Sequence, residues 1–195
     1  MISHGIVERD QIRHFISQIR HRQCEFFFDI GANIGIYTVF VARETKCRTI
    51  FAFEPDQYCY DQLRTNLLLN GLSERVETRP AAISNQDGEI SFELGPSTHR
   101  ILSKVGSGST IEKSVALMRL DAIISCSGRR IALKIDIEGH ELIALDGMKR
   151  LLETNQCFLQ VECWEENSAL FVAEMARCGY VLTHRIDVDH YFANF

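Results

Sequence analysis

Apolar residues recur at helical spacing in several segments of the chain. In residues 10–22 they fall three and four positions apart and form one stripe, made of Ile12, Phe15, Ile16 and Ile19. Longer helices are also predicted over 36–44, 56–70, 141–154 and 165–177, and a short helix over 121–125 with Asp121 as its cap. The apolar segments between them are too short for helices, so they are expected to be strands.

Five short apolar segments are predicted to be buried strands: 24–30, 48–54, 75–84, 130–138 and 157–162. A half-exposed strand is expected over 88–94 and an extended segment over 115–120. Strands that alternate with helices indicate a parallel sheet covered by helices on both faces. The last two strands, 180–186 and 190–194, are joined by a turn too short for a parallel crossover, so they must run antiparallel.

The chain contains no repeat, low-complexity tract or proline-rich linker, so we expect a single domain over residues 1–195. The segment 1–22 is expected to contribute one N-terminal helix. Residues 95–110 are rich in glycine, serine and threonine, which predicts a mobile surface loop that could act as a lid.

Charge and composition exclude several classes of protein. The 195 residues carry 21 Lys and Arg against 26 Asp and Glu, a formal net charge of −5, so a nucleic-acid partner is not expected. No apolar run approaches the ~18 residues that span a bilayer, and the N-terminus has no signal-peptide pattern. We therefore expect a cytoplasmic protein without a membrane partner. Its seven cysteines lack C-x-x-C spacing and are expected to be reduced thiols, most of them buried.

Candidate chemistry gathers where the predicted strands end, which is where open parallel sheets bind ligands. Four of the five buried strands end in or beside a carboxylate: Asp29, Glu54, Asp136 and Glu162. After the first, Gly31 and Gly35 permit a sharp turn and close packing of the next helix. This D-x-G-x-x-x-G pattern alone fits a plain strand-to-helix turn equally well. Glu54 lies where an acid would bind ribose hydroxyls, which favours a nucleoside cofactor.

The charge beside the loop indicates which cofactor this is. The sequence lacks the third glycine of G-x-G-x-x-G, and Asp29 would repel a pyrophosphate, so a nicotinamide dinucleotide is the least favoured alternative. A carboxylate suits a ligand with an ammonium or sulfonium group, and S-adenosylmethionine has both. Asn33 stands where many such loops have glycine, and asparagine tolerates left-handed backbone angles.

Five motifs occur in the order seen in one enzyme family: DIGANIGIYT, FAFEPDQ, RLDAII, LKIDIEGHE and LQVE. Over residues 24–195 the chain therefore resembles the FkbM-type methyltransferases, which are class I S-adenosylmethionine-dependent enzymes. The resemblance implies an α/β fold, a Rossmann-like three-layer sandwich with a mostly parallel seven-stranded sheet and an antiparallel C-terminal hairpin. It also implies methyl transfer, commonly to a hydroxyl of a small molecule, a sugar or glycan, or another natural product.

The resemblance also assigns cofactor-binding residues. The methionine end of S-adenosylmethionine would lie against Asp29, Gly31, Ala32, Asn33 and Gly35. Glu54 would hold the ribose, and Thr38 could reach the cofactor's carboxylate. The adenine would be bordered by Pro55, Asp56, Ala81 and Ala82.

A second cluster, KIDIEGHE, lies at the end of the strand predicted over 130–138. We predict that His140 is the general base that takes the hydroxyl proton, with Asp136 and Glu138 setting its position and charge. The two carboxylates would raise the pKa of the imidazole. The alternative for His140 is a surface loop residue. Lys134 faces the same side of the strand as Asp136 and is interpreted as a structural ion-pair partner.

Several alternatives stay open. Glu141 is interpreted as an acid at a helix N-terminus, and Glu162 as either an ion-pair partner or a site residue. Asp136 with Glu138, His140 or Glu162 could bind a divalent cation, but the spacing is not distinctive and no metal is favoured. An N-methyltransferase, or an inactive cofactor-binding module, would use the same fold. The identity of the acceptor is not indicated.

Overall fold

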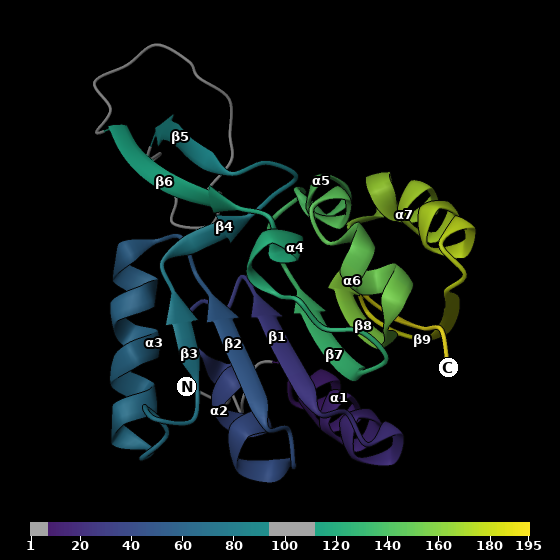
Figure 1. Cartoon of the computed structure of the whole chain (residues 1–195), viewed down its shortest axis with the longest axis horizontal. Helices are drawn as coiled ribbons and strands as arrows, with labels where there is room; N and C mark the ends of the chain where they lie inside the picture. The colour runs from purple at the N-terminus through teal and green to yellow at the C-terminus, as the bar shows by residue number, and fades with distance from the viewer. Residues whose placement is uncertain (1–7, 94–111) are drawn as a thin grey trace, which may run out of the picture.

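The computed structural model describes residues 8–93 and 112–195, so the loop predicted over 95–110 lies outside the described residues. The main sheet has seven strands in the order β3-β2-β1-β7-β8-β10-β9 (Figure 1). Their bounds are β1 Phe26–Ile30, β2 Thr49–Phe53, β3 Glu77–Arg79, β7 Arg130–Ile135, β8 Gln156–Glu162, β9 Val181–Ile186 and β10 Asp189–Ala193. Only β10 runs against its neighbours β8 and β9, and the other pairings are parallel. The predicted sheet with its antiparallel C-terminal hairpin is confirmed.

Helices cover both faces of this sheet. Their bounds are α1 Arg9–Arg22, α2 Ile36–Glu44, α3 Gln57–Leu69, α4 Leu120–Ile123, α5 Glu141–Asp146, α6 Lys149–Thr154 and α7 Glu165–Arg177. Neighbouring residues of β1 show the two layers, since Phe27 belongs to the buried cluster of α1, α2 and α3, and Phe28 to that of α4, α5, α6 and α7. Adjacent strand residues point to opposite faces, so the predicted three-layer sandwich is confirmed. None of the helices that the structure describes has the length and apolar character needed to span a bilayer.

The strand predicted over 75–84 is wrong as a single element. The chain forms β3 in the main sheet and then β4 (Ala81–Ile83), which belongs to a separate sheet of order β4-β6-β5, with β5 (Gly88–Glu93) and β6 (Glu112–Met118). Pro80 lies between β3 and β4, and a proline nitrogen has no hydrogen to donate to a sheet. The strands expected over 88–94 and 115–120 are present, and they pair with each other.

The helix predicted over 141–154 is also wrong as a single element, because α5 and α6 are separated at Gly147. A Cβ atom at Gly147 would lie 1.8 Å from the Ser84 carbonyl oxygen, so this point of the chain packs directly against the end of β4. The backbone of Gly147, with a φ of −79°, is one that any residue adopts. Glycine is therefore required here for space, and the requirement comes from a strand more than 60 residues earlier.

Asp121 caps a different helix from the one predicted. The N-cap of its own helix, α4, is Arg119, whose side chain makes no capping hydrogen bond within the described part of the chain. The Asp121 carboxylate instead accepts hydrogen bonds from the backbone N–H groups of Arg150 and Leu151, at 2.8 and 2.9 Å. N–H groups in the first turn of a helix have no partner inside that helix, so this contact allows α6 to start directly after the break.

Candidate functional site

The carboxyl ends of β2, β1, β7 and β8 lie side by side at one edge of the main sheet (Figure 1). This topology brings the four predicted end residues, Glu54, Asp29, Asp136 and Glu162, to one edge. Asp29 is paired with Lys134 in the β1–β7 register, and Lys134 with Gln160 in the β7–β8 register. Directly paired residues point to the same face, so a row of polar side chains crosses the sheet just below its acidic edge.

The loop between β1 and α2 makes the predicted tight turn. Gly31 has a φ of 79°, and a Cβ atom there would lie 1.9 Å from the backbone oxygen of Asp136, so only glycine fits between β1 and β7. Gly35 has a φ of 84°, and its Cβ would lie 2.4 Å from the Leu63 side chain of α3. Asn33 also has a left-handed backbone, with a φ of 51°. The loop therefore follows the backbone of its neighbours closely.

Glu54 joins this loop to the next strand end. It is 4% exposed, and its two carboxylate oxygens accept hydrogen bonds from the N–H groups of Asn33 at 2.7 Å and Asp56 at 2.8 Å. Burial raises the pKa of Glu54, and these two hydrogen bonds act in the opposite direction. Each carboxylate oxygen has a second lone pair, so the group can accept two further hydrogen bonds, such as those that ribose hydroxyls donate.

The residues predicted beside the adenine lie on two segments at the β2 side of the site. Pro55 and Asp56 are half-buried, and the Asp56 carboxylate caps α3 by accepting hydrogen bonds from two N–H groups of its first turn, each at 3.0 Å. Ala81 is buried and Ala82 half-buried in β4, which directly follows β3. Because β3 pairs with β2, both segments lie near the end of β2.

Asp29 and Thr38 form a buried pair beneath the loop. Both residues are 0% exposed, and the Thr38 hydroxyl donates a 2.5 Å hydrogen bond to Asp29 Oδ2. The predicted contact of Thr38 with a cofactor carboxylate would have to replace this bond. The other oxygen, Asp29 Oδ1, is buried and has no hydrogen-bond partner among the residues that the structure describes. Burial raises the pKa of Asp29, and the charge of Lys134 acts in the opposite direction.

The predicted ion pair of Lys134 is confirmed. Its ammonium lies 2.9 Å from Asp136 Oδ2 and donates a 3.0 Å hydrogen bond to the Gly31 carbonyl oxygen, and its side chain is 7% exposed. Burial alone would lower the pKa of Lys134, but the Asp136 and Asp29 carboxylates raise it above its usual value. Burial alone would raise the pKa of Asp136, but Lys134 brings it below its usual value. Lysine and aspartate are therefore both charged at neutral pH.

Three carboxyl groups meet where β7 and β8 end. Asp136, Glu138 and Glu162 each bring one oxygen to within 4.8 Å of the others. Burial, the charge of Asp136 and a hydrogen bond with Asp136 raise the pKa of Glu162 to about 8. The spacing would also accommodate a divalent cation, although the Lys134 ammonium already supplies positive charge to Asp136.

The environment of His140 differs from the one that the sequence predicts. The residue is half-buried, and its Nε2 lies 3.0 Å from the hydroxyl oxygen of Ser84, just after β4. Burial lowers the pKa of His140, so the expectation that Asp136 and Glu138 raise it is wrong. The ring is therefore neutral at pH 7. The contact with Ser84 was missed, because it depends on where β4 lies and leaves no local signal in the sequence.

The predicted role of Glu141 at a helix N-terminus is confirmed. It is the first residue of α5, and its Oε1 accepts hydrogen bonds from the N–H groups of Ile137 at 3.2 Å and Gly139 at 3.0 Å. These bonds fix the short loop that carries Glu138 and His140. The carboxylate of Glu141 thus acts on the backbone of the site.

A buried polar group beside Glu162 was also missed. Gln160 Nε2 donates hydrogen bonds to the Tyr37 hydroxyl at 2.7 Å and to Asp189 at 3.0 Å, and none of the three residues is more than 8% exposed. Burial raises the pKa of Asp189 to about 6. The glutamine within the apolar strand FLQVE was the available signal, because a buried amide needs partners. Its partners come from α2 and β10, which only the fold brings together.

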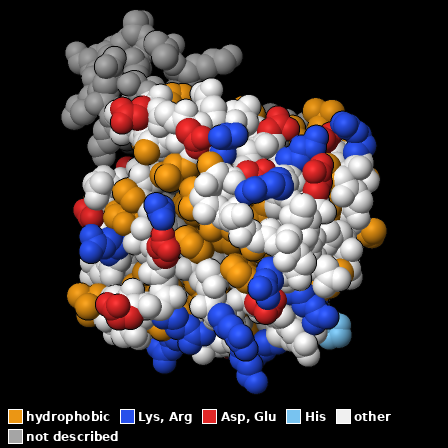
Figure 2. All heavy atoms as spheres, in the orientation of Figure 1, with side chains coloured by type: hydrophobic (Ala, Val, Ile, Leu, Met, Phe, Trp, Pro, Cys, Tyr) orange, Lys and Arg blue, Asp and Glu red, His pale blue; other side chains and the backbone are white. Residues whose placement is uncertain are grey.

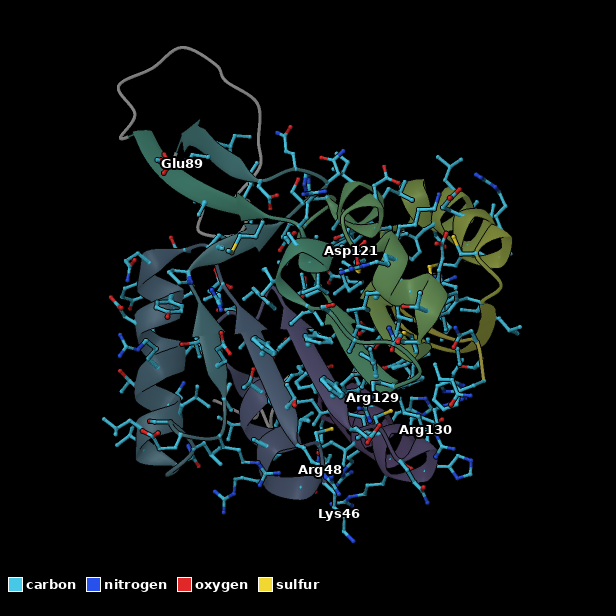
Figure 3. The ribbon with its side chains drawn as sticks, viewed as in Figure 1. Lys46, Arg48, Glu89, Asp121, Arg129 and Arg130 are labelled. Carbon is cyan, nitrogen blue, oxygen red and sulfur yellow. The ribbon has the colours of Figure 1, made fainter. Side chains whose placement is uncertain are left out.

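Charge differs between the two ends of the sheet. Where the strands begin, Lys46, Arg48, Arg129 and Arg130 are exposed (Figure 3), and Figure 2 shows blue side chains along the same lower edge. The opposite edge holds the carboxylates described above together with Lys134. The carboxyl edge is therefore the one suited to a ligand that carries positive charge.

Comparisons with known proteins give a family and a fold. The sequence model described as "Methyltransferase FkbM domain" matches residues 29–182. Methyltransferase sdnD of Sordaria araneosa is 27% identical over 72% of this chain, and hexuronic acid methyltransferase AglP of Haloferax volcanii is 28% identical over 75%. These alignments cover 66% and 59% of the two relatives, so the chain spans less than two thirds of their length.

Two solved structures with a similar fold carry methyltransferase names. Methyltransferase FkbM from Methylobacillus flagellatus KT has a TM-score of 0.63 and 21% identity, covering 87% of this chain and 43% of that protein. Precorrin-6y C5,15-methyltransferase from Geobacter metallireducens has a TM-score of 0.58 and 14% identity, covering 99% of this chain and 90% of that protein. At these identities the likeness concerns the fold.

Proposed function

This chain belongs to the methyltransferase FkbM domain family, and from that premise we propose that it transfers the methyl group of S-adenosylmethionine to an acceptor hydroxyl. The observation that carries the proposal is the bridge made by Glu54. Its carboxylate binds the N–H groups of Asn33 and Asp56, and so joins the glycine loop after β1 to the end of β2. A ribose held by the same carboxylate would be placed between these two segments.

The residues at this edge suit S-adenosylmethionine in charge. Its methionine end would be held by Asp29, Gly31, Ala32, Asn33 and Gly35, its ribose by Glu54, and its adenine by Pro55, Asp56, Ala81 and Ala82. Asp29 Oδ1, buried with no hydrogen-bond partner in residues 8–93 and 112–195, is an acceptor suited to an ammonium, and Thr38 fixes the carboxylate from its other oxygen. When bound, the cofactor supplies an electrophilic methyl group on a sulfonium.

The chain must then hold the acceptor oxygen in line with that methyl group and remove its proton. Asp136 and Glu138 lie at the end of β7, and the backbone of Asp136 touches Gly31 of the loop. His140 is the base predicted from the sequence, and its neutral ring can accept a proton. Because Nε2 faces Ser84, its other nitrogen, Nδ1, would have to face the acceptor.

A small molecule or a glycan with free hydroxyls is the proposed acceptor class. The relative AglP is named for a hexuronic acid, which carries several hydroxyl groups. An ionised carboxylate accepts hydrogen bonds only, so an edge with Asp136 and Glu138 suits an acceptor rich in O–H donors. The formal charge of −5 argues against a nucleic-acid acceptor.

Transfer of labelled methyl groups tests this proposal. Incubation with methyl-labelled S-adenosylmethionine and a panel of sugars and hydroxylated small molecules is expected to yield a labelled ether and an equal amount of S-adenosylhomocysteine. NMR of the product locates the label. A label on nitrogen would identify an N-methyltransferase instead. Tight cofactor binding without transfer to any acceptor would favour an inactive binding module.

A further inference from the structure

Two carboxyl groups lie next to each other at the centre of the acidic edge. Ile135 of β7 pairs with Val161 of β8, so the next residues, Asp136 and Glu162, lie side by side at the ends of parallel strands. One carboxyl oxygen of Asp136 lies within 4.8 Å of one of Glu162. Two negative charges this close and partly buried repel each other, which favours one proton on the pair.

Lys134 determines which of the two groups keeps this proton. Its ammonium lies 2.9 Å from Asp136 Oδ2 and favours the ionised form of Asp136. Glu162 instead is near the carboxyl groups of Asp136 and Glu138, which follow β7, and of Asp189 on β10. Burial and these negative charges raise the pKa of Glu162, so the proton stays on Glu162 at neutral pH.

The pair lies against the loop proposed to hold the cofactor. Lys134 donates a 3.0 Å hydrogen bond to the Gly31 carbonyl oxygen, and a Cβ atom on Gly31 would lie 1.9 Å from the Asp136 backbone oxygen. Glu162, one strand further along, is half-buried, so part of its side chain is open to the edge of the site. An acceptor brought to the methyl group over β7 and β8 would therefore meet Glu162.

We propose, on the basis of the proposed function, that Glu162 takes the proton from the acceptor hydroxyl and that Asp136 is the positioning residue that orients it. An O–CH₃ bond forms as the S–CH₃ bond breaks, and the electron pair of the broken bond stays on sulfur, giving a neutral thioether. The hydroxyl proton moves to the ionised carboxylate of Glu162. It leaves to water after product release, which restores the base.

This role predicts a different pH dependence from that of His140. Burial lowers the pKa of His140, so its ring is already neutral at pH 7 and would give a level rate above that pH. Glu162 must lose its proton to act, so kcat/KM for S-adenosylmethionine should rise with pH through about 8 and then level off. A positively charged cofactor nearby favours the ionised carboxylate, so the rise in kcat should occur at lower pH than the rise in kcat/KM.

Substitution of Glu162 tests this assignment. Glu162→Gln is expected to lower kcat about 10²–10⁴-fold, to leave the KM for S-adenosylmethionine nearly unchanged, and to remove the rise above pH 7. Asp146→Asn replaces an exposed acid of α5 and serves as the matched control, in which kcat and the rise above pH 7 should both be unchanged. Asp136→Asn should move the rise to lower pH, because Glu162 loses a neighbouring negative charge.

Carbon-13 NMR of glutamate side-chain carboxyls gives a readout that needs neither cofactor nor acceptor. The signal that disappears in Glu162→Gln is expected to titrate above pH 7 in the wild-type chain, against about 4.3 for an ordinary glutamate. In Asp136→Asn the pH midpoint of the Glu162 signal should be lower than in the wild-type chain. If Glu162→Gln does not fold, the glutamate signal whose midpoint is lowered in Asp136→Asn is assigned to Glu162.

Several results would overturn the proposal. One is a titration midpoint of the Glu162 carboxyl signal near that of an ordinary glutamate. Another is near-normal turnover with an unchanged pH profile in Glu162→Gln. Activity that chelation removes and Mg²⁺ restores would assign the carboxylates to a cation instead. Cofactor binding without methyl transfer to any acceptor would overturn both the proposed function and this role, whereas an ordinary midpoint in an active methyltransferase would overturn the role alone.

Discussion

Replacement of Lys134 by methionine is expected to lower the free energy of unfolding by about 3–5 kcal/mol at pH 7. The lysine side chain is 7% exposed, and its ammonium lies 2.9 Å from Asp136 Oδ2. Methionine fills a similar volume, so the main change is the loss of a cation. Asp136 and the fully buried Asp29 both lose the charge that stabilises their ionised forms.

The loss of stability in Lys134→Met should shrink as the pH falls. Without the ammonium, the folded-state pKa values of Asp29 and Asp136 rise, so the folded variant binds protons more readily than the unfolded chain. Stability from a raised folded-state pKa is present at low pH and is lost as the pH increases through that pKa. Urea titrations at pH 7 and in mild acid measure both effects.

Lys149→Met is the matched control for this substitution. Lys149 is exposed on α6 and lies 4.0 Å from Glu153, so its replacement should change the free energy of unfolding by less than about 1 kcal/mol. A change as small as this in Lys134→Met at pH 7 would contradict the role of Lys134 as the counter-charge of the site.

Glu54→Gln is expected to weaken the binding of S-adenosylhomocysteine roughly 10- to 150-fold, because a hydrogen bond to a charged group contributes about 1.5–3 kcal/mol. An amide has one acceptor oxygen where the carboxylate has two. It cannot serve the ribose and also both backbone N–H groups, those of Asn33 and Asp56. Calorimetry measures the affinity of each protein directly.

Glu74→Gln is the matched control, since Glu74 is an exposed acid in the loop before β3 and should leave the affinity unchanged. Thermal unfolding and circular dichroism establish whether each variant is folded. Unchanged affinity in a folded Glu54→Gln protein would contradict the assignment of Glu54 to the ribose.

The position of the candidate site could be predicted from sequence because it depends on local chemistry at strand ends. Gly31 and Gly35 occupy left-handed backbone positions that neighbouring chain segments leave open only to glycine. Glu54 ends the next strand, and parallel strands bring such ends to one edge. The ion pair of Lys134 could be predicted for a similar reason, since two residues separated by one along a strand point the same way.

The remaining features depend on contacts between distant segments. Pro80 moves the chain out of the main sheet, and the sheet that it enters then provides the contacts of Gly147 and His140. No periodicity within residues 141–154 signals the break at Gly147, because its cause lies at Ser84. The pKa of His140 was predicted in the wrong direction for the same reason, since burial depends on the whole fold and its effect is larger than that of neighbouring charges.

Whether the loop after β1 and Glu54 hold S-adenosylmethionine is tested most directly by calorimetric titration of the wild-type chain with S-adenosylhomocysteine, with NAD as the comparison. We expect saturable binding of one S-adenosylhomocysteine per chain and no binding of NAD at the same concentrations. A ligand that binds only the folded chain also raises its Tm, which provides an independent check. A folded chain that fails to bind S-adenosylhomocysteine, or that binds NAD more tightly, would contradict the proposed cofactor.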